Sequence, residues 1–414
     1  MTIYCGIDWA AQHHDVAIVN DAGTVLATRR VGESAAGVTA LLMMLADQAA
    51  ADAGVAAGEF VAVDVAIETG RGLLVSAVRA AGHRVYEINP KASSRYRDRY
   101  AVSGSKSDAG DALVLAHLLR TDRDRHRPMP ADSEGVQALG VLARAQQDAV
   151  WTVLRDAGRL RAVLWEFYPA ALQAFPNLHI SSAVTVLAAA PTPSAAARLS
   201  EAELRELLHA ARYNAPRELP ARLRAIFTAE QLRQPPAVEA AMGQVVRAIV
   251  RTMAATLTSI KQLEKALDEH FGQHPDAEIL RSLPGLGVVL GARVLGEFGD
   301  DPTRFADAAS RRAYAGSAPI TRASGKVRLV LVRRVRNRRL SDACRWWAFL
   351  ATQHSPGANA CYQRRRAAGD GHEAALRRLA SKLLGQLHHC LTNRVLYDED
   401  KAWAQPAAEA EHAA

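Results

Sequence analysis

The amino-terminal part of this chain places acidic residues at the ends of predicted structural elements. Asp8 and Glu68 each follow a short apolar run. Asp108 and Asp111 stand three residues apart at the start of a helical pattern, so they share one face of that helix. Carboxylates repel each other unless a hard cation lies between them, and oxygen-rich sites suit Mg²⁺. The pattern therefore predicts a metal-dependent enzyme whose four acids come from distant parts of the chain.

Each acid taken alone has a simpler interpretation. Asp8 can cap a turn, and Asp108 and Asp111 are favourable at any helix N-terminus. Gly6-Ile7-Asp8 is also how actin-like sugar kinases and ATPases begin, but the further glycine-rich phosphate loops of those folds do not follow in order. The four acids together, each at the edge of an element, favour the metal site.

The first 125 residues alternate between strand and helix signals. The strand-like segments are 3–7, 16–19, 24–30, 60–67 and 84–88, and the helix-like segments are 38–51, 72–81 and 108–120. A turn at Asn20-Asp21-Ala22-Gly23 joins two of the strands. Two antiparallel pairs followed by alternating helices and strands predict a mixed sheet covered by helices.

A linker at Pro128-Met129-Pro130 precedes a helical region. Apolar residues recur at three-, four- and seven-residue steps from Leu139 to Phe167, and again from Val238 to Leu267. Two such stripes indicate an antiparallel helical hairpin or a coiled coil between subunits, and two core helices of one protomer fit the pattern equally well.

Positive charge is concentrated in the last third of the chain. Between Arg311 and Arg366 there are 14 Lys and Arg residues and one acid, Asp342, so this segment carries +13 while the whole chain carries +8. A regional basic patch is typical of polyanion binding. It includes the dense run Arg333, Arg334, Arg336, Arg338 and Arg339, with no acid among them.

Two motifs flank the start of this patch. Leu283-Pro284-Gly285-Leu286-Gly287 separates two short helical patterns and resembles a helix–hairpin–helix, in which Gly285 and Gly287 permit close approach to a DNA backbone. A tight turn between helices without a ligand is the alternative. Ser324 lies in a small-residue loop beside Arg322, Lys326 and Arg328. A Ser-Gly pair is most often a turn, so the residues alone do not identify Ser324 as a nucleophile.

Several features exclude other classes of protein. The four cysteines have no zinc-like spacing and are too few for a disulfide scaffold. The chain has no signal-peptide pattern, and no uncharged apolar run approaches the roughly 20 residues that span a bilayer. We therefore expect a soluble protein of a reducing cytoplasm. Trp346 and Trp347 could stack on bases, but core packing in a helix is favoured.

With these residues assembled, the chain resembles the IS110 family of transposases over nearly its whole length. The first motifs are Gly-Ile-Asp at Asp8, Glu-Thr-Gly at Glu68 and Lys-Ser-Asp-x-x-Asp-Ala at Asp108 and Asp111. The later ones are Leu-Pro-Gly-Leu-Gly, Phe-Gly-Asp, Tyr-Ala-Gly-x-Ala-Pro and the Ser-Gly-Lys of Ser324. Relatives often have Ser-Gly-Gly, whereas Lys326 follows Gly325 here. Ser317, where relatives often have Leu, ranks below Ser324.

The resemblance implies a RuvC-like, RNase H-type α/β domain over residues 1–127, in which Asp8, Glu68, Asp108 and Asp111 bind Mg²⁺. It implies a helical coiled-coil region over 128–274 and a mainly helical transposase domain over 275–396 with a helix–hairpin–helix and a serine, matched by Ser324, that attacks DNA. Residues 397–414 form a tail that we expect to fray. The implied partners are donor and target DNA, an RNA encoded by the element, and further copies of the chain in a dimer or tetramer.

A RuvC-like nuclease or junction resolvase that uses metal-activated water remains the main alternative. A nucleic-acid-binding protein without activity and an actin-like kinase are two further ones.

Overall fold

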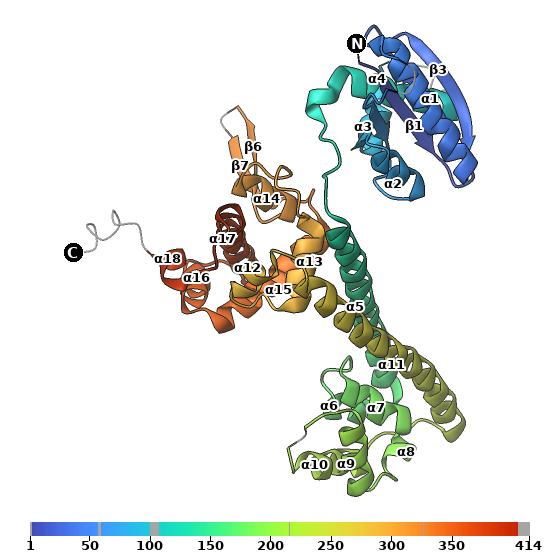
Figure 1. The fold of residues 1–414 in the computed structure, drawn as a ribbon. Coiled ribbons are helices and arrows are strands. Elements are labelled where there is room, and N and C mark those ends of the chain that lie inside the picture. The colour runs from blue at the N-terminus through green and yellow to red at the C-terminus, as the bar shows by residue number, and fades with distance from the viewer. Residues whose placement is uncertain (1, 57–58, 100–106, 215, 326, 405–414) are drawn as a thin grey trace, which may run out of the picture. The chain divides into compact units, whose positions relative to one another are not determined.

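The computed structural model in Figure 1 describes residues 2–56, 59–99, 107–214, 216–325 and 327–404. The chain divides into two compact units, Met1–Ala131 and Asp132–Ala414. Lys326 lies outside the described residues. Among the helices of these described ranges, none has both the length and the apolar character needed to cross a membrane.

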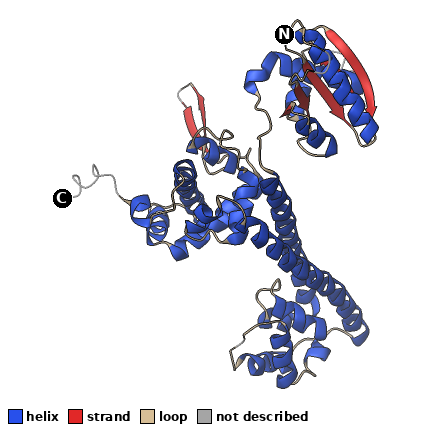
Figure 2. Cartoon of the chain, viewed as in Figure 1, coloured by secondary structure: helices blue, strands red, loops and turns tan. Residues whose placement is uncertain are grey.

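Unit 1 (Met1–Ala131) is built on a five-stranded mixed sheet (Figure 2). The strands are β1 (Tyr4–Trp9), β2 (His13–Val19), β3 (Val25–Gly32), β4 (Asp64–Ile67) and β5 (Arg84–Glu87). Their order is β3-β2-β1-β4-β5, with β1, β2 and β3 antiparallel and β4 and β5 parallel to β1. The turn between β2 and β3 needs glycine, because Gly23 has a φ of 83°. The predicted mixed sheet is confirmed.

Helices cover both faces of this sheet. On one face, α1 (Ala35–Ala53) and α2 (Leu73–Ala80) pack on Cys5, Ile7, Val16 and Ile18. On the other face, α4 (Asp108–Asp122) packs on Tyr4 and Ala66 beside α3 (Pro90–Arg97), and the single turn η1 (Arg123–Arg125) follows α4. The sequence pattern did not predict α3. Pro90 ends the preceding strand but is also a suitable first residue of a helix, and Asn89 caps its N-terminus.

Two long helices organise unit 2 (Asp132–Ala414). The start of α5 (Glu134–Phe167) shares a core with the end of α11 (Pro236–Gly272), through Leu139 and Phe271. The end of α5 shares a second core with the start of α11, through Leu164 and Val246. The two helices therefore pack antiparallel within one chain. Between them lie α6 (Pro169–Ala174), α7 (Ser181–Ala189), α8 (Pro193–Ala196), α9 (Glu201–Ala210) and α10 (Leu219–Thr228).

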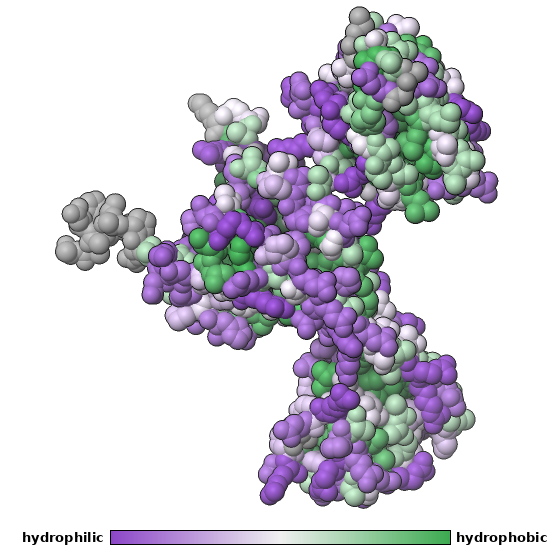
Figure 3. All heavy atoms as spheres, in the orientation of Figure 1, coloured by the Kyte–Doolittle hydropathy of each residue, from purple (hydrophilic) through white to green (hydrophobic). Residues whose placement is uncertain are grey.

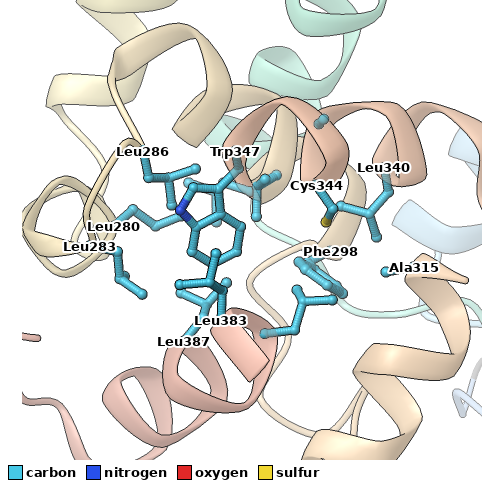
Figure 4. Close-up of a cluster of buried hydrophobic side chains, with 14 of the residues drawn as sticks. Leu280, Leu283, Leu286, Phe298, Ala315, Leu340, Cys344, Trp347, Leu383 and Leu387 are labelled. Carbon is cyan, nitrogen blue, oxygen red and sulfur yellow. The ribbon is translucent and has the colours of Figure 1, made fainter. Parts of the chain in front are cut away.

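The rest of unit 2 is mainly helical and surrounds Trp347. Its helices are α12 (Ala277–Ser282), α13 (Val288–Phe298), α14 (Ala308–Ala315), α15 (Arg338–His354), α16 (Pro356–Ala367), α17 (His372–Asn393) and α18 (Glu399–Trp403). Figure 4 shows the Trp347 ring between leucines of α12, of the turn after α12, and of α17. The indole Nε1–H donates to the Pro284 carbonyl at 3.0 Å. Core packing is thus confirmed for Trp347, whereas Trp346 is 43% exposed.

Two segments of unit 2 differ from expectation. The segment around Ser324, predicted as a loop, forms the hairpin of β6 (Ile320–Ser324) and β7 (Val327–Leu331), because its alternating β-branched and aliphatic residues pair across the strands. The frayed tail predicted after Tyr397 begins instead with α18. Trp403 of α18 donates to the Tyr397 hydroxyl at 2.7 Å, and Lys382 lies 4.3 Å from its ring.

Candidate active-site residues

Helix α4 crosses β1 in close contact at Gly6. A Cβ atom built on Gly6 would lie 2.0 Å from the Ala112 carbonyl oxygen and 2.5 Å from the Ala116 nitrogen. Only glycine therefore allows this approach. Because side chains alternate along a strand, Asp8 projects to the same face of the sheet as Gly6, the face that α4 covers. The Gly-Ile-Asp motif thus positions both an acid and the helix that carries two more.

The acids of the sheet lie in one row across neighbouring strands. Asp8 on β1 stands directly opposite Asp15 on β2, and Asp15 stands opposite Arg30 on β3. On the other side of β1, Ile7 pairs with Ile67 of β4, so the next residues, Asp8 and Glu68, are also neighbours. Side chains directly opposite each other share a face, so the row lies under the start of α4. The structure thus brings Asp8 and Glu68 to the same edge as Asp108 and Asp111.

Two arginines neutralise part of this acidic row. Arg30 donates two hydrogen bonds to the buried Asp15, at 3.1 and 2.8 Å, and its Nη2 lies 3.8 Å from Asp108. These bonds to Asp15 raise the pKa of the Arg30 guanidinium. Arg97 of α3 binds the buried Asp111 at 2.6 Å. Like charges directly opposite each other destabilise a sheet, so the arginines offset that repulsion.

Glu68 is held by α3. The Ser93 hydroxyl lies within hydrogen-bonding distance of Glu68 Oε1 and of the Pro90 carbonyl, which share its single proton. The missed helix α3 therefore contributes Ser93 and Arg97, one partner to each of two predicted acids. No sequence pattern marks Ser93 or Arg97, because their role depends on how α3 packs beside α4.

The closest group of possible metal ligands is not the predicted set. Within the described part of the chain, one group of three has all its ligand atoms within 4.8 Å of one another, and it is His13, Asp15 and Asp108. Asp8, Glu68 and Asp111 are not members of this group. Carboxylate oxygens fit a hard divalent cation, and His13 is an additional ligand type that Mg²⁺ seldom takes. Asp15 was missed, although its place opposite Asp8 follows from the register of the hairpin.

Ser324 is the last residue of β6, at the end of the hairpin. Its side chain is exposed and it pairs with Val327, and Gly325 has a φ of 55° that suits the turn. Arg322 lies on the same face of the ribbon as Ser324, whereas Arg328 pairs with Ala323 and lies on the other face. Exposed Val327, Leu329 and Val330 surround these polar residues, so Figure 3 shows hydrophobic and hydrophilic residues mixed on the hairpin.

The remaining predicted binding residues lie at the root of the hairpin and in the turn before α13. Arg333 donates to the Ala318 carbonyl and Arg336 to the Arg333 carbonyl, while Arg334 is exposed. Gly285 packs on α15, since a Cβ atom there would lie 2.6 Å from the Ala351 nitrogen. Gly287 is exposed at the N-terminus of α13 and would meet no atom within 4 Å. Gly287 is therefore open to a ligand, and Gly285 is required by packing.

Two family models match this chain. A model of IS110-type transposases with an Asp-Glu-Asp-Asp site, described as "Transposase", matches residues 5–169, and "Transposase IS116/IS110/IS902 family" matches residues 277–363. The first match indicates a RuvC-like α/β domain that acts with a divalent metal, in agreement with the mixed sheet and its acidic edge.

Similar proteins cover nearly the whole chain. The "Mini-circle putative transposase for IS117" of Streptomyces coelicolor is 52% identical over 409 residues, which are 98% of this chain and 97% of the relative. The IS110 "uncharacterized 43.6 kDa protein" of the same organism is 31% identical over 79% of this chain and 80% of its own length. The IS900 "uncharacterized 42 kDa protein" of Mycobacterium paratuberculosis is 29% identical over 95% and 97%. Together with the matched models, these relatives show that the chain belongs to the IS110 family of insertion-sequence transposases.

Proposed function

We propose that this transposase cuts and rejoins DNA through a covalent bond between Ser324 and a DNA phosphate, with Mg²⁺ held by Asp8, Glu68, Asp108 and Asp111. The proposal is supported by the strand register, which puts Asp8 beside Glu68, and by the close contact of β1 with the helix that carries Asp108 and Asp111, in a chain of a transposase family. A divalent cation bound there supplies neutralisation of the charge that develops on an attacked phosphate.

The reaction conserves one phosphoester bond at each step. The Ser324 hydroxyl loses its proton, its Oγ forms a bond to phosphorus, and the bond from phosphorus to one DNA oxygen breaks. The released DNA oxygen takes up a proton and becomes a free hydroxyl. A hydroxyl of another strand then displaces Ser324, so strand exchange and resealing need no ATP.

Activation of the serine is the reason to propose a composite site. No described residue forms a hydrogen bond to the Ser324 side chain, and a serine hydroxyl is a poor nucleophile without an activating neighbour. We therefore place the acids of one protomer beside Ser324 of another, in a dimer or tetramer. Apolar side chains on α5, such as Val141 (67% exposed) and Trp165 (75% exposed), are available for assembly.

Mixing two inactive variants tests the composite site. Asp8→Asn and Ser324→Ala should each abolish strand transfer of a labelled DNA substrate in Mg²⁺. If the acids and the serine come from different protomers, an equal mixture of the two variants should recover part of the wild-type activity. A mixture as inactive as either variant alone would contradict the composite site but not the two roles.

DNA contacts are proposed for the transposase domain over 275–396. Gly285 and Gly287 would form the turn of a helix–hairpin–helix on the DNA backbone, and the arginine side chains of Arg322, Arg328, Arg333, Arg334 and Arg336, with Lys326, would bind phosphates. The support is the exposed Gly287 at a helix N-terminus and the exposed arginines of the hairpin. In the proposed domain organisation, the RuvC-like domain over 1–127 and the helical region over 128–274 precede this transposase domain.

The family resemblance implies a further partner, which is a guide RNA encoded beside the gene. We propose that the protein acts in the cytoplasm. RNA that copurifies with the chain and maps to the flanking non-coding DNA would support guided recombination. Protein that recombines its substrate after ribonuclease treatment, with no RNA bound, would contradict it.

The second candidate function is that of a RuvC-like nuclease or junction resolvase. All four acids belong to unit 1, so water in place of Ser324 could attack the phosphate there. A denaturing gel separates the two functions, because only the serine mechanism produces a protein–DNA adduct. Wild type and Ser317→Ala should form the adduct and Ser324→Ala should not. Cleavage by Ser324→Ala at the wild-type rate would favour the nuclease.

A further inference from the structure

Unit 2 contains a cavity of about 710 Å³ at the root of the Ser324 hairpin. It lies between Trp151 of α5, the end of α14, the segment after β7, and the facing sides of α15 and α17. Its lining includes five arginines and two acids, so it is strongly positive. Only one of the arginines, Arg336, belongs to the phosphate-binding set proposed above.

Existing interactions account for three of the five arginines. Arg339 pairs with Asp148 at 2.9 Å, Arg345 pairs with Glu373, and Arg336 donates to the Arg333 carbonyl. Among the described residues, Arg338 and Arg377 form no ion pair within 4 Å, although the charge of Arg377 helps to lower the pKa of Asp370 and of Glu373. The two guanidinium groups therefore remain available for an anion from outside.

The wall of the cavity is not purely charged. Arg339 lies over the Trp151 ring, 5.2 Å from its centroid, and forms a cation–π pair. Apolar side chains such as Val332 and the buried Cys344 complete the lining. Burial raises the pKa of the Cys344 thiol to about 12, so this residue contributes apolar surface and not reactivity. A flat aromatic surface beside free arginines suits a base and its phosphate.

We propose that this cavity binds one unpaired nucleotide of a single-stranded nucleic acid, with its phosphate on Arg338 and Arg377 and its base against Trp151. This inference rests on the proposed function, and it adds a site that binds single-stranded nucleic acid in preference to a duplex. A concave cavity of this size can accept a base and its phosphate together, whereas in a duplex the base is held in the stack.

The position of the cavity relates a nucleotide bound there to the phosphate that Ser324 would attack. Val332 lines the cavity and follows β7, whose first residue pairs with Ser324. At a strand rise of about 3.4 Å per residue, Ser324 lies about 17 Å away, which is about five nucleotides of stacked strand. A nucleotide held in the cavity would thus fix the hairpin relative to a phosphate about five positions away.

Fluorescence anisotropy with the full chain in EDTA tests the site without strand cleavage. The probes are a 20-nucleotide DNA, an RNA of the same sequence, and the blunt DNA duplex. The variant Arg338→Ala with Arg377→Ala should lower the slope of log affinity against log salt by about 0.7 for each lost phosphate contact on the single strands. Trp151→Leu should weaken single-strand binding about 5-fold or more with the slope unchanged.

A matched control removes the same charge elsewhere. Arg222→Ala with Arg247→Ala changes two exposed arginines of α10 and α11 that lie outside the basic patch and do not line the cavity, and it should leave both quantities unchanged. Arg338→Ala alone, at an exposed side chain, carries the test if the double variant does not fold. Loss on DNA only, on RNA only, or on both identifies which single strand enters.

Two results would overturn the proposal. One is that the cavity variants bind all probes as the control does, and the other is that the duplex loses as much affinity as the single strands. If wild type binds the probes and the cavity variants do not differ, only the cavity is refuted. If wild type binds none of the probes, the proposed function fails as well.

Discussion

Replacing Gly6 by alanine should separate the acids without touching any of them. The new Cβ atom would lie 2.0 Å from the Ala112 carbonyl oxygen, and ordinary contact begins at 3.4 Å. The backbone of α4 must therefore move away from β1 by about 1.4 Å. Helix α4 carries Asp108 and Asp111, whereas Asp8 stays on β1, so the same movement widens the gap between the acids of the helix and that of the strand.

Two measurable losses follow from this displacement. Overpacking a core by one methyl group destabilises a protein by about 1–3 kcal/mol, and we expect Gly6→Ala to fall at the upper end because both contacts are with backbone atoms. A misplacement of about 1 Å at an active site lowers the rate about 100-fold. Strand transfer in Mg²⁺ should decrease by about that factor at a temperature where the variant is folded.

Gly158→Ala is the matched control. Gly158 is exposed in the middle of α5, and a Cβ atom there meets nothing within 4 Å. The same substitution should therefore stabilise the protein by about 0.5–1 kcal/mol and leave strand transfer unchanged. Urea unfolding and the strand-transfer rate measure both effects. A Gly6→Ala variant with wild-type stability and activity would refute the account of how α4 and β1 position the acids.

Three further predictions concern the stability of the two units. Asp64→Asn should destabilise unit 1 by about 3 kcal/mol in urea unfolding, because the fully buried Asp64 binds Arg84 at 2.5 Å and Arg123 at 2.6 Å. A loss below about 1 kcal/mol would show that these ion pairs contribute little to stability. Trp347→Ala should cost about 3–5 kcal/mol, whereas Trp346→Ala should cost much less; similar losses would contradict the assignment of the core. Burial lowers the pKa of His83, whose Nδ1 accepts a hydrogen bond from the Val63 N–H. The neutral form of His83 therefore stabilises the fold fully above about pH 6.5, and this contribution is lost as pH falls towards the pKa of the folded state. The wild-type melting temperature should therefore drop more between pH 7.5 and 5.5 than that of His83→Gln. Equal decreases of the melting temperature would show that protonation of His83 does not change the stability of the fold.

The sheet and its acids could be predicted because they depend on local signals. Alternation of apolar residues identified the strands, and the Asn20–Gly23 turn fixed the antiparallel pair of β2 and β3. Parallel strands then follow from helical segments between them. Asp8 and Glu68 could be predicted as candidate site residues because each ends an apolar run, which is a feature of the sequence and not of the packing.

The counter-charges could not be predicted in the same way. Arg30 and Arg97 meet Asp15 and Asp111 only through the register of β3 and the packing of α3, and neither is local. The hairpin that carries Ser324 was also missed, since small residues and glycine around it are typical of a loop. Its strands depend on pairing between Ile320–Ser324 and Val327–Leu331, which a pattern of single residues does not reveal.

The central claim is that the acids and Ser324 act on one phosphate. A phosphorothioate at the scissile position tests it, because sulfur binds Mg²⁺ poorly and softer Mn²⁺ better. We predict that the Ser324–DNA adduct on a denaturing gel decreases strongly with this substrate in Mg²⁺, and that Mn²⁺ restores it for wild type but not for Asp8→Asn. Equal adduct formation on both substrates in Mg²⁺, by wild type and Asp8→Asn alike, would contradict the claim.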